Sequence, residues 1–193
     1  MACIIRRARL GDEVNLAYIQ TESWKAAFGK ILPEDIIQKT TEIEPAITMY
    51  QQLLHKEIGK GYILEVDSNP HCMAWWDKSR EDDMLDYAEL ICIHSLKEGW
   101  GKGYGSQMMN HVLSEIQQAG YNKVTLWVFT ENTRARKFYD RFGFSFKGKS
   151  KTYFEKEEMC YEKILHQRDK ASDNTIVKTS YFEKQFPLRG TNL

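Results

Sequence analysis

The sequence lacks a long hydrophobic run and an excess of charge of either sign. No apolar stretch approaches the roughly 18 residues of a membrane-spanning helix, and residues 1–7 contain no apolar signal-peptide core. The 27 basic residues are balanced by 27 acidic residues, so bulk charge gives no attraction to nucleic acid or to an anionic membrane. We therefore expect a cytoplasmic protein without nucleic-acid or membrane partners.

Cysteine is scarce, and its few positions are scattered. Cys3, Cys72, Cys92 and Cys160 form no C-x-x-C pair, and the five histidines show no metal-ligand spacing. Three of the four cysteines lie in apolar segments that are typical of strands. This pattern favours reduced thiols in a core and predicts neither a disulfide nor a bound metal.

Two common phosphate-binding motifs do not fit the glycine-rich stretch that follows residue 98. Around residues 99–106 the chain contains neither the G-x-x-x-x-G-K-[ST] of a P-loop nor the G-x-G-x-x-G of a dinucleotide-binding fold. It does contain glycine at every second position from Gly99 to Gly105, between the apolar run 90–93 and an amphipathic helix pattern. Glycine allows close backbone approach, and a helix N-terminus attracts phosphate oxygens. The pattern predicts a diphosphate cradle, with a simple strand-to-helix turn as the alternative.

The remaining pattern predicts one domain over residues 1–165, because 193 residues suit a single core. We expect strands at 3–8, 62–66, 73–76, 87–94, 123–129, 144–146 and 158–164, and helices from 12, around 36, at 44–57, after the glycines and from 132. The first helix is expected to bury Val14, Tyr18, Ile19 and Ala26. This order indicates a mixed α+β sheet with helices on both faces. Residues 166–193 lose the pattern and form a C-terminal extension, either a docking arm or a disordered tail.

Two motifs resemble those of the GNAT family of N-acetyltransferases. The first runs from Trp100 to Gly105 (WGKGYG) and is similar to [Q/R]-x-x-G-x-[G/A]; the second runs from Asn132 to Tyr139 (NTRARKFY), with Gly-Phe following at 143–144. The resemblance covers about residues 4–165. It implies transfer of acetyl from acetyl-coenzyme A to an amine, on a mostly antiparallel sheet with one splayed parallel strand pair. Trp100 departs from the family's Gln or Arg, which keeps a non-catalytic acetyl-coenzyme A sensor among the alternatives.

The resemblance also implies which residues hold the coenzyme. These are Ile93, Ser95, Gly101, Lys102, Gly103, Tyr104, Gly105, Ser106, Asn132 and Tyr139. The backbone of Ile93 and Ser95 would pair with the pantetheine arm as with an added strand. Lys102 or another base would meet part of the diphosphate charge. Asn132 would reach the arm or cap the last helix.

Acetyl transfer to an amine calls for a base, an acid and an oxyanion donor. A lysine-like amine has a pKa near 10.4, so almost all of it is protonated near neutral pH and a general base can speed the reaction. Glu89 matches the strand position of the catalytic glutamate in the histone-acetyltransferase branch, with a solvent-facing side chain as the alternative; Glu65 and His94 are weaker candidates. Tyr139 is expected to protonate the leaving thiolate, or else to pack in the core. Stabilisation of the oxyanion is assigned to the backbone N–H of Ile93, which would donate a hydrogen bond to it.

We expect the acceptor of the acetyl group to be a small-molecule amine, and a protein N-terminus or lysine is the alternative. Family acceptor sites use the first helices and the hairpin, which here contribute Trp24, Phe28, Trp75 and Trp76. These rings would hold a cation or a ring by stacking, or else pack in the core. The acidic run 81–83 would attract a cationic amine or simply face solvent. A homodimer is expected only by analogy with relatives.

Overall fold

A single seven-stranded sheet organises the protein. The computed structural model describes residues 3–165, so the expected extension at 166–193 lies outside the described residues. The strands lie in the order β1-β2-β3-β4-β5-β7-β6. Their bounds are β1 Cys3–Arg7, β2 Lys60–Val66, β3 Asn69–Lys78, β4 Ala88–Ser95, β5 Lys123–Phe129, β6 Ser145–Tyr153 and β7 Lys156–Ile164. The helices are α1 Glu13–Phe28, α2 Glu34–Thr40, α3 Ile43–His55, α4 Tyr104–Gln118 and α5 Thr133–Arg141.

The sheet is antiparallel except where β4 meets β5. That parallel pair has only two register positions, Ala88 opposite Val124 and Glu89 opposite Thr125. Both strands continue past this point, to Ser95 and Phe129, without pairing to each other. The predicted mixed sheet with one splayed parallel pair is therefore confirmed, and the splay opens at the carboxyl ends of both strands.

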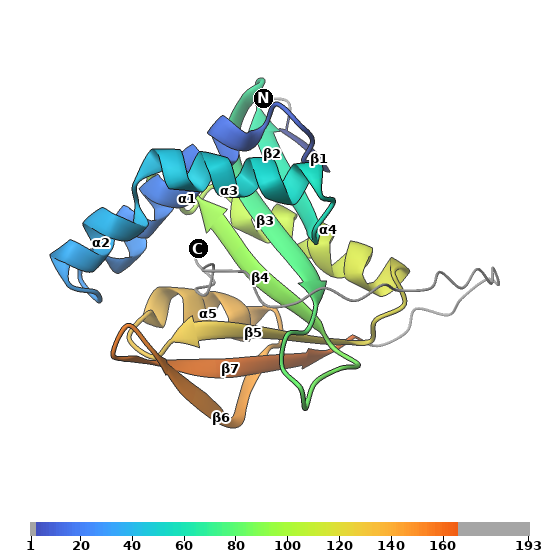
Figure 1. Ribbon diagram of the computed structural model, residues 1–193. Helices are drawn as coiled ribbons and strands as arrows, with labels where there is room; N and C mark the ends of the chain where they lie inside the picture. Colours follow the sequence, from blue (N-terminus) through green and yellow to red (C-terminus); the bar gives the residue numbers. More distant parts are fainter. Residues whose placement is uncertain (1–2, 166–193) are drawn as a thin grey trace.

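Helices cover both faces of the sheet, as predicted. Helices α1 and α3 lie together across one face of β2, β3 and β4, and α4 lies across the opposite face (Figure 1). The α4 side chains that face the sheet are Met108, Met109, Val112 and Ile116, at helical spacing, and all four are fully buried. They share one core with α5, so both helices that follow the splayed strands pack on the same side.

The prediction for the buried face of α1 is partly wrong. Ile19 is buried, but Val14 and Tyr18 are 57% and 50% exposed. The polar residue Gln20 takes an interior position because its side-chain oxygen accepts a hydrogen bond of 2.5 Å from the buried hydroxyl of Tyr50 on α3. The buried face thus includes a polar position that apolar periodicity does not reveal.

The final strand pair is longer than predicted. Strand β6 extends to Tyr153, well beyond the expected 144–146, because it is an edge strand in which lysines replace the apolar alternation. Cys72, Cys92 and Cys160 are buried free thiols, as expected, and Cys3 is an exposed one. None of the described helices is long and apolar enough to cross a membrane.

Candidate functional site

The glycine run forms the turn between β4 and α4. Gly101 and Gly103 have φ angles of 78° and 84°, a left-handed conformation that disfavours residues with a Cβ. Gly103 is the N-cap residue of α4, and no side chain caps this helix. Within the described residues, the backbone N–H groups of Tyr104, Gly105 and Ser106 have no hydrogen-bond acceptor. The first turn of α4 therefore presents three donors and the positive end of the helix dipole.

These donors line a hollow of about 200 Å³. Its walls come from the end of β4, the glycine turn, the start of α4 and one face of α5, and consist of Ser95, Gly99, Trp100, Gly101, Gly103, Tyr104, Gly105, Ser106, Arg134, Phe138 and Arg141. The structure thus brings the two sequence motifs together in one hollow. Lys102 is exposed and does not line it.

Arg134 places a positive charge beside Trp100 at the edge of this hollow. The indole Nε1 of Trp100 donates a hydrogen bond of 2.9 Å to the carbonyl oxygen of Ser95, which fixes the ring beside the hollow. The guanidinium carbon of Arg134 lies 3.3 Å from the centroid of that ring. Burial lowers the pKa of Arg134 to about 10, so the side chain stays charged at neutral pH. Sequence reasoning missed Arg134, although it stands inside the second motif, directly before Ala135.

The splayed strands lead from this hollow into the sheet. Ile93 and Ser95 lie on the part of β4 that is not paired with β5, and both are buried. Asn132 caps α5, since its side-chain oxygen accepts a hydrogen bond of 3.1 Å from the N–H of Ala135. Tyr139 on α5 is fully buried and belongs to the same core cluster as Ile93, with ring contacts to Phe144 and Tyr161. The acid and the oxyanion donor expected from the sequence therefore belong to the same core cluster.

Glu89 is held by an arginine. Its two carboxylate oxygens accept hydrogen bonds from Nη2 and Nε of Arg80, at 2.5 and 2.9 Å, and from the Arg80 backbone N–H at 3.2 Å. The residue is only 2% exposed, so it does not face solvent. Burial works to lower the pKa of Arg80, but the hydrogen bond and charge of Glu89 outweigh it, and the pKa is raised.

The weaker base candidates differ sharply from each other. His94 is fully buried next to Ile93, and neither ring nitrogen has a hydrogen-bond partner among the described residues. Burial lowers its pKa to about 3, so the imidazole is neutral. Glu65 instead lies on β2 and binds Arg6, whose Nε donates to its carboxylate at 3.1 Å. Of these two residues, only His94 lies on the strand that leads into the splay.

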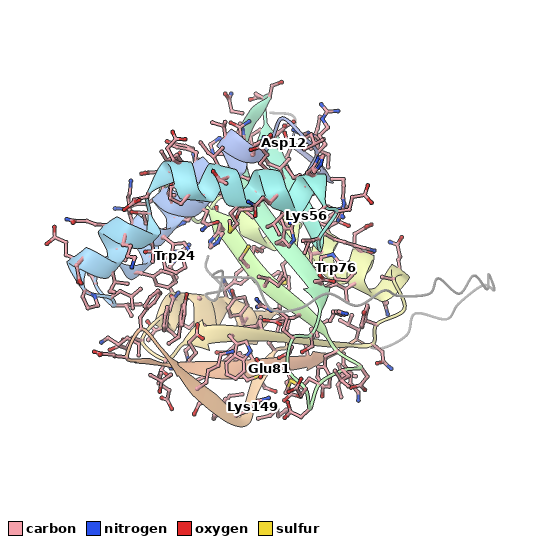
Figure 2. All side chains as sticks on the ribbon, in the orientation of Figure 1. Asp12, Trp24, Lys56, Trp76, Glu81 and Lys149 are labelled. Atoms are coloured by element: carbon pink, nitrogen blue, oxygen red, sulfur yellow. The ribbon has the colours of Figure 1, made fainter. Side chains whose placement is uncertain are left out.

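The structure brings together two of the aromatic residues expected at the acceptor site. Trp24 and Phe28 on α1 contact each other with ring centroids 4.9 Å apart, and Phe28 contacts Phe129 at the end of β5 at 5.1 Å. Trp75 lies elsewhere, against Tyr50, and its Nε1 donates a hydrogen bond to the Ile58 carbonyl oxygen. Figure 2 places Trp24 near the helices α1 and α2 and Trp76 at the distant end of β3.

The acidic loop between β3 and β4 is tied to the edge strand β6. Lys149 binds Asp83 at 2.6 Å and Glu81 at 3.3 Å, and Lys151 also binds Glu81. Glu81 and Lys149 lie next to each other at the base of the molecule in Figure 2. These carboxylates are thus neutralised by neighbouring lysines, which weakens the case that they attract an amine. Among the described residues, no cluster of His, Cys, Asp and Glu is arranged to hold a metal.

Comparison with known proteins gives the family. The acetyltransferase (GNAT) family model matches residues 23–144, which include both motifs and the splayed strands. The chain belongs to the GNAT acetyltransferase family. No curated protein matches the chain at a significant level.

Solved structures of GNAT proteins share the fold. The PaiA N-acetyltransferase of Thermoplasma acidophilum, in complex with coenzyme A, is 19% identical with a TM-score of 0.72, covering 86% of this chain and all of that one. The yncA protein of Salmonella typhimurium, solved with its cofactor acetyl-CoA, is 13% identical with a TM-score of 0.66, covering 89% and 99%. A ribosomal-protein-alanine N-acetyltransferase of Brucella melitensis is 15% identical with a TM-score of 0.64, covering 84% and 99%.

Proposed function

We propose that this GNAT protein transfers acetyl from acetyl-coenzyme A to a primary amine of a small molecule, by direct attack within a ternary complex. The observation that carries the proposal is the hollow at the start of α4. There, three uncapped backbone N–H groups and the Arg134 guanidinium converge beside the end of a splayed strand. Such donors match a diphosphate, and the edge of β4 beyond Glu89, which β5 leaves open, matches an extended amide-bearing arm.

Each coenzyme-binding residue has a defined task in this proposal. The N–H groups of Tyr104, Gly105 and Ser106 donate to the diphosphate, while Arg134 replaces the cation or amide that Trp100 lacks. The backbone of Ile93 and Ser95 bonds to the pantetheine arm. Acetyl-coenzyme A, when bound, supplies an acyl group already activated as a thioester.

Proton transfer is assigned to side chains near the splay. Phenols ordinarily keep their proton at neutral pH, so we assign the protonation of the departing thiolate to the Tyr139 hydroxyl. The Ile93 N–H meets the developing oxyanion. Glu89 is proposed as the base that takes the proton from the amine through water, with its carboxylate positioned by Arg80. His94 is the alternative base, because it is neutral and buried beside Ile93.

Trp24 and Phe28 are proposed to border the acceptor. They lie at the end of α1 and touch Phe129 at the carboxyl end of β5, where the splayed strands open. This aromatic group favours an amine that carries a ring or an apolar part. The Brucella protein is named for acetylation of a ribosomal protein's alanine, so a protein amine is the second candidate. The balanced net charge gives no support for docking on a ribosome.

The test is a measurement of thiol release from acetyl-coenzyme A with a panel of small amines and, separately, with peptides that carry a free N-terminus or lysine. Turnover with small amines alone supports the proposal, whereas turnover with peptides alone supports the protein-directed alternative. Tight binding of acetyl-coenzyme A without turnover on any acceptor identifies a sensor instead. Absence of binding contradicts all three.

A further inference from the structure

Glu158 is a buried acidic residue to which the proposed chemistry gives no task. It lies on β7, next to β5 in the sheet (Figure 1), and 0% of its surface is exposed. Glutamate is almost never fully buried in proteins, because a carboxylate loses its hydration unless a positive or hydrogen-bonding group meets it. A fully buried glutamate near a candidate site therefore calls for a functional explanation.

The strand register places Glu158 at the aromatic group that is proposed to border the acceptor. Glu158 is opposite Phe129 in the antiparallel pair of β5 and β7, so the two side chains lie on the same face of the sheet. Phe129 contacts Phe28 on α1, with ring centroids 5.1 Å apart, and stacks on Tyr153 at 6.2 Å. A carboxylate thus lies next to the rings that the acceptor is proposed to contact.

The same register separates Glu158 from the reacting centre. Glu89 is opposite Thr125 in the parallel pair. Four residues further along the two strands lie Ile93 and Phe129, and Glu158 is opposite the latter. At ordinary strand spacing β7 is about 9–10 Å from β4, and the splay between β4 and β5 adds to this distance. An amine that attacks beside the Ile93 N–H is therefore out of reach of Glu158, whereas a second group of the same acceptor can reach it.

Lys151 is the charged neighbour of Glu158 on the other side. It is opposite Glu158 in the pair of β6 and β7. The Lys151 ammonium binds Glu81 at 3.3 Å and lies 3.2 Å from the centroid of the Trp127 ring, so its charge has other partners when a ligand cation approaches. The apolar surroundings of Glu158 strengthen the attraction between its carboxylate and such a cation.

We propose that Glu158 binds a second cationic group of the acceptor, so that the acceptor is an amine with a further ammonium group at its far end, as in an α,ω-diamine. This inference rests on the proposed function, because the first amine must take the acetyl group. The rings of Phe28 and Phe129 would pack on the methylene chain between the two nitrogens. Because Glu158 is covered, the acceptor reaches it when side chains of the β6–β7 turn move aside. Tyr153 and Phe154 at this turn are partly buried and pack on each other at 4.2 Å.

The experiment compares two acceptors of equal chain length, 1,5-diaminopentane and 5-amino-1-pentanol, which has a neutral hydroxyl in place of the second ammonium. The full chain with acetyl-coenzyme A is expected to show a kcat/KM at least about tenfold higher for the diamine, as a charge-assisted contact predicts. In Glu158→Gln, which keeps the shape but removes the charge, this ratio should fall below about threefold through the diamine alone. Glu157→Gln removes an exposed carboxylate from the same strand and should keep the wild-type ratio.

A second variant tests the position of the carboxylate. Glu158→Asp keeps the charge but draws it back by one methylene, so the preferred acceptor should change from 1,5-diaminopentane to the longer 1,6-diaminohexane. A carboxylate that only stabilises the fold would not alter the preferred chain length. This variant also tests the inference if Glu158→Gln fails to fold.

The outcomes separate this inference from the proposed function. Equal kcat/KM of the wild-type protein for the diamine and the amino alcohol overturns the inference and leaves the acetyltransferase proposal standing. Turnover only on amines without a second charge has the same consequence. A preference for the diamine that survives in Glu158→Gln overturns the assignment to Glu158. If no amine or peptide is acetylated, both proposals fail together.

Discussion

The guanidinium of Arg134 stacks on the indole ring of Trp100, 3.3 Å from its centroid, and the two residues come from different sequence motifs. Trp100 stands where the family motif that the sequence resembles would have Gln or Arg, and its Nε1 donates a hydrogen bond to the Ser95 carbonyl oxygen. The Trp100 ring thus contacts a cation that α5 provides. In the proposed function, this contact between segments that are distant in sequence offsets the departure from the family motif.

Replacing Arg134 should weaken coenzyme binding more than it changes the fold. We expect Arg134→Gln to raise the dissociation constant for coenzyme A by about tenfold or more, because a charge-assisted contact to the diphosphate is lost. Arg134→Lys keeps the charge but loses the planar stack, so an intermediate value is expected. Calorimetry gives the constants, with Lys56→Gln as the control for removal of one charge. Wild-type affinity in Arg134→Gln would remove this residue from the site.

Tyr139→Phe is expected to separate turnover from coenzyme binding. The variant keeps the ring packed against Phe144 and Tyr161 but removes the hydroxyl proton. If this proton goes to the leaving thiolate, the turnover number should fall at least about tenfold with little change in coenzyme affinity. Tyr121→Phe removes a hydroxyl from a tyrosine that packs on Trp76 and serves as the control. Unchanged turnover in Tyr139→Phe would leave this tyrosine as a core residue only.

The sequence predicted the parts of this molecule that depend on local pattern. The strand at 123–129, the cap at Asn132 and the helix after the glycines follow from alternation, capping chemistry and helical spacing. The partners of the site residues were not predictable in the same way. Neither the contact between Trp100 and Arg134 nor the ion pair between Glu89 and Arg80 leaves a periodic trace, because tertiary packing creates them.

The errors in the sequence predictions have the same origin. Val14 and Tyr18 fit an apolar stripe, yet they are exposed because α1 buries Gln20 against Tyr50 instead. Strand β6 runs beyond its expected end because its backbone pairs with β7 as far as Tyr153, and its lysines also bind the acidic loop, as Lys149 binds Asp83. In each case a polar interaction with another segment, and not the local apolar pattern, accompanies the difference.

Glu89→Gln removes both the proposed base and the ion pair with Arg80. A second variant, Arg80→Gln, is therefore needed to tell the two losses apart. Removing the carboxylate takes away the ion-pair partner of a largely buried guanidinium, Arg80, which should cost about 2 kcal/mol or more of unfolding free energy. Arg80→Gln should destabilise to a similar degree, as measured by denaturant unfolding. Glu89→Gln should move the pH optimum of turnover upward, because the amine must then lose its proton without help, whereas Arg80→Gln keeps the carboxylate. An identical pH–rate profile in Glu89→Gln and wild type would leave Glu89 a structural partner of Arg80.

The buried, neutral state of His94 leads us to predict that the protein loses stability in mild acid. Its pKa is lowered by burial from 6.5 to about 3, so the unfolded chain binds a proton in this window and the folded chain does not. The stabilisation is therefore complete above pH 6.5 and is lost as the pH falls toward 3. Between about pH 6.5 and 5, this one group should remove about 1.5 kcal/mol from the unfolding free energy.

The measurement compares wild type with His94→Leu, which has a side chain of similar size that cannot titrate. Urea unfolding at about pH 6.5, 5.8 and 5.0 should give a shallower dependence on pH in the variant, because only wild type must keep a neutral imidazole buried. His55→Leu, at the exposed end of α3, is the control and should keep the wild-type slope. Turnover of His94→Leu adds a second readout: a shifted pH–rate profile would favour His94 over Glu89 as the base. Equal slopes in His94→Leu and wild type would contradict the neutral buried state on which that role depends.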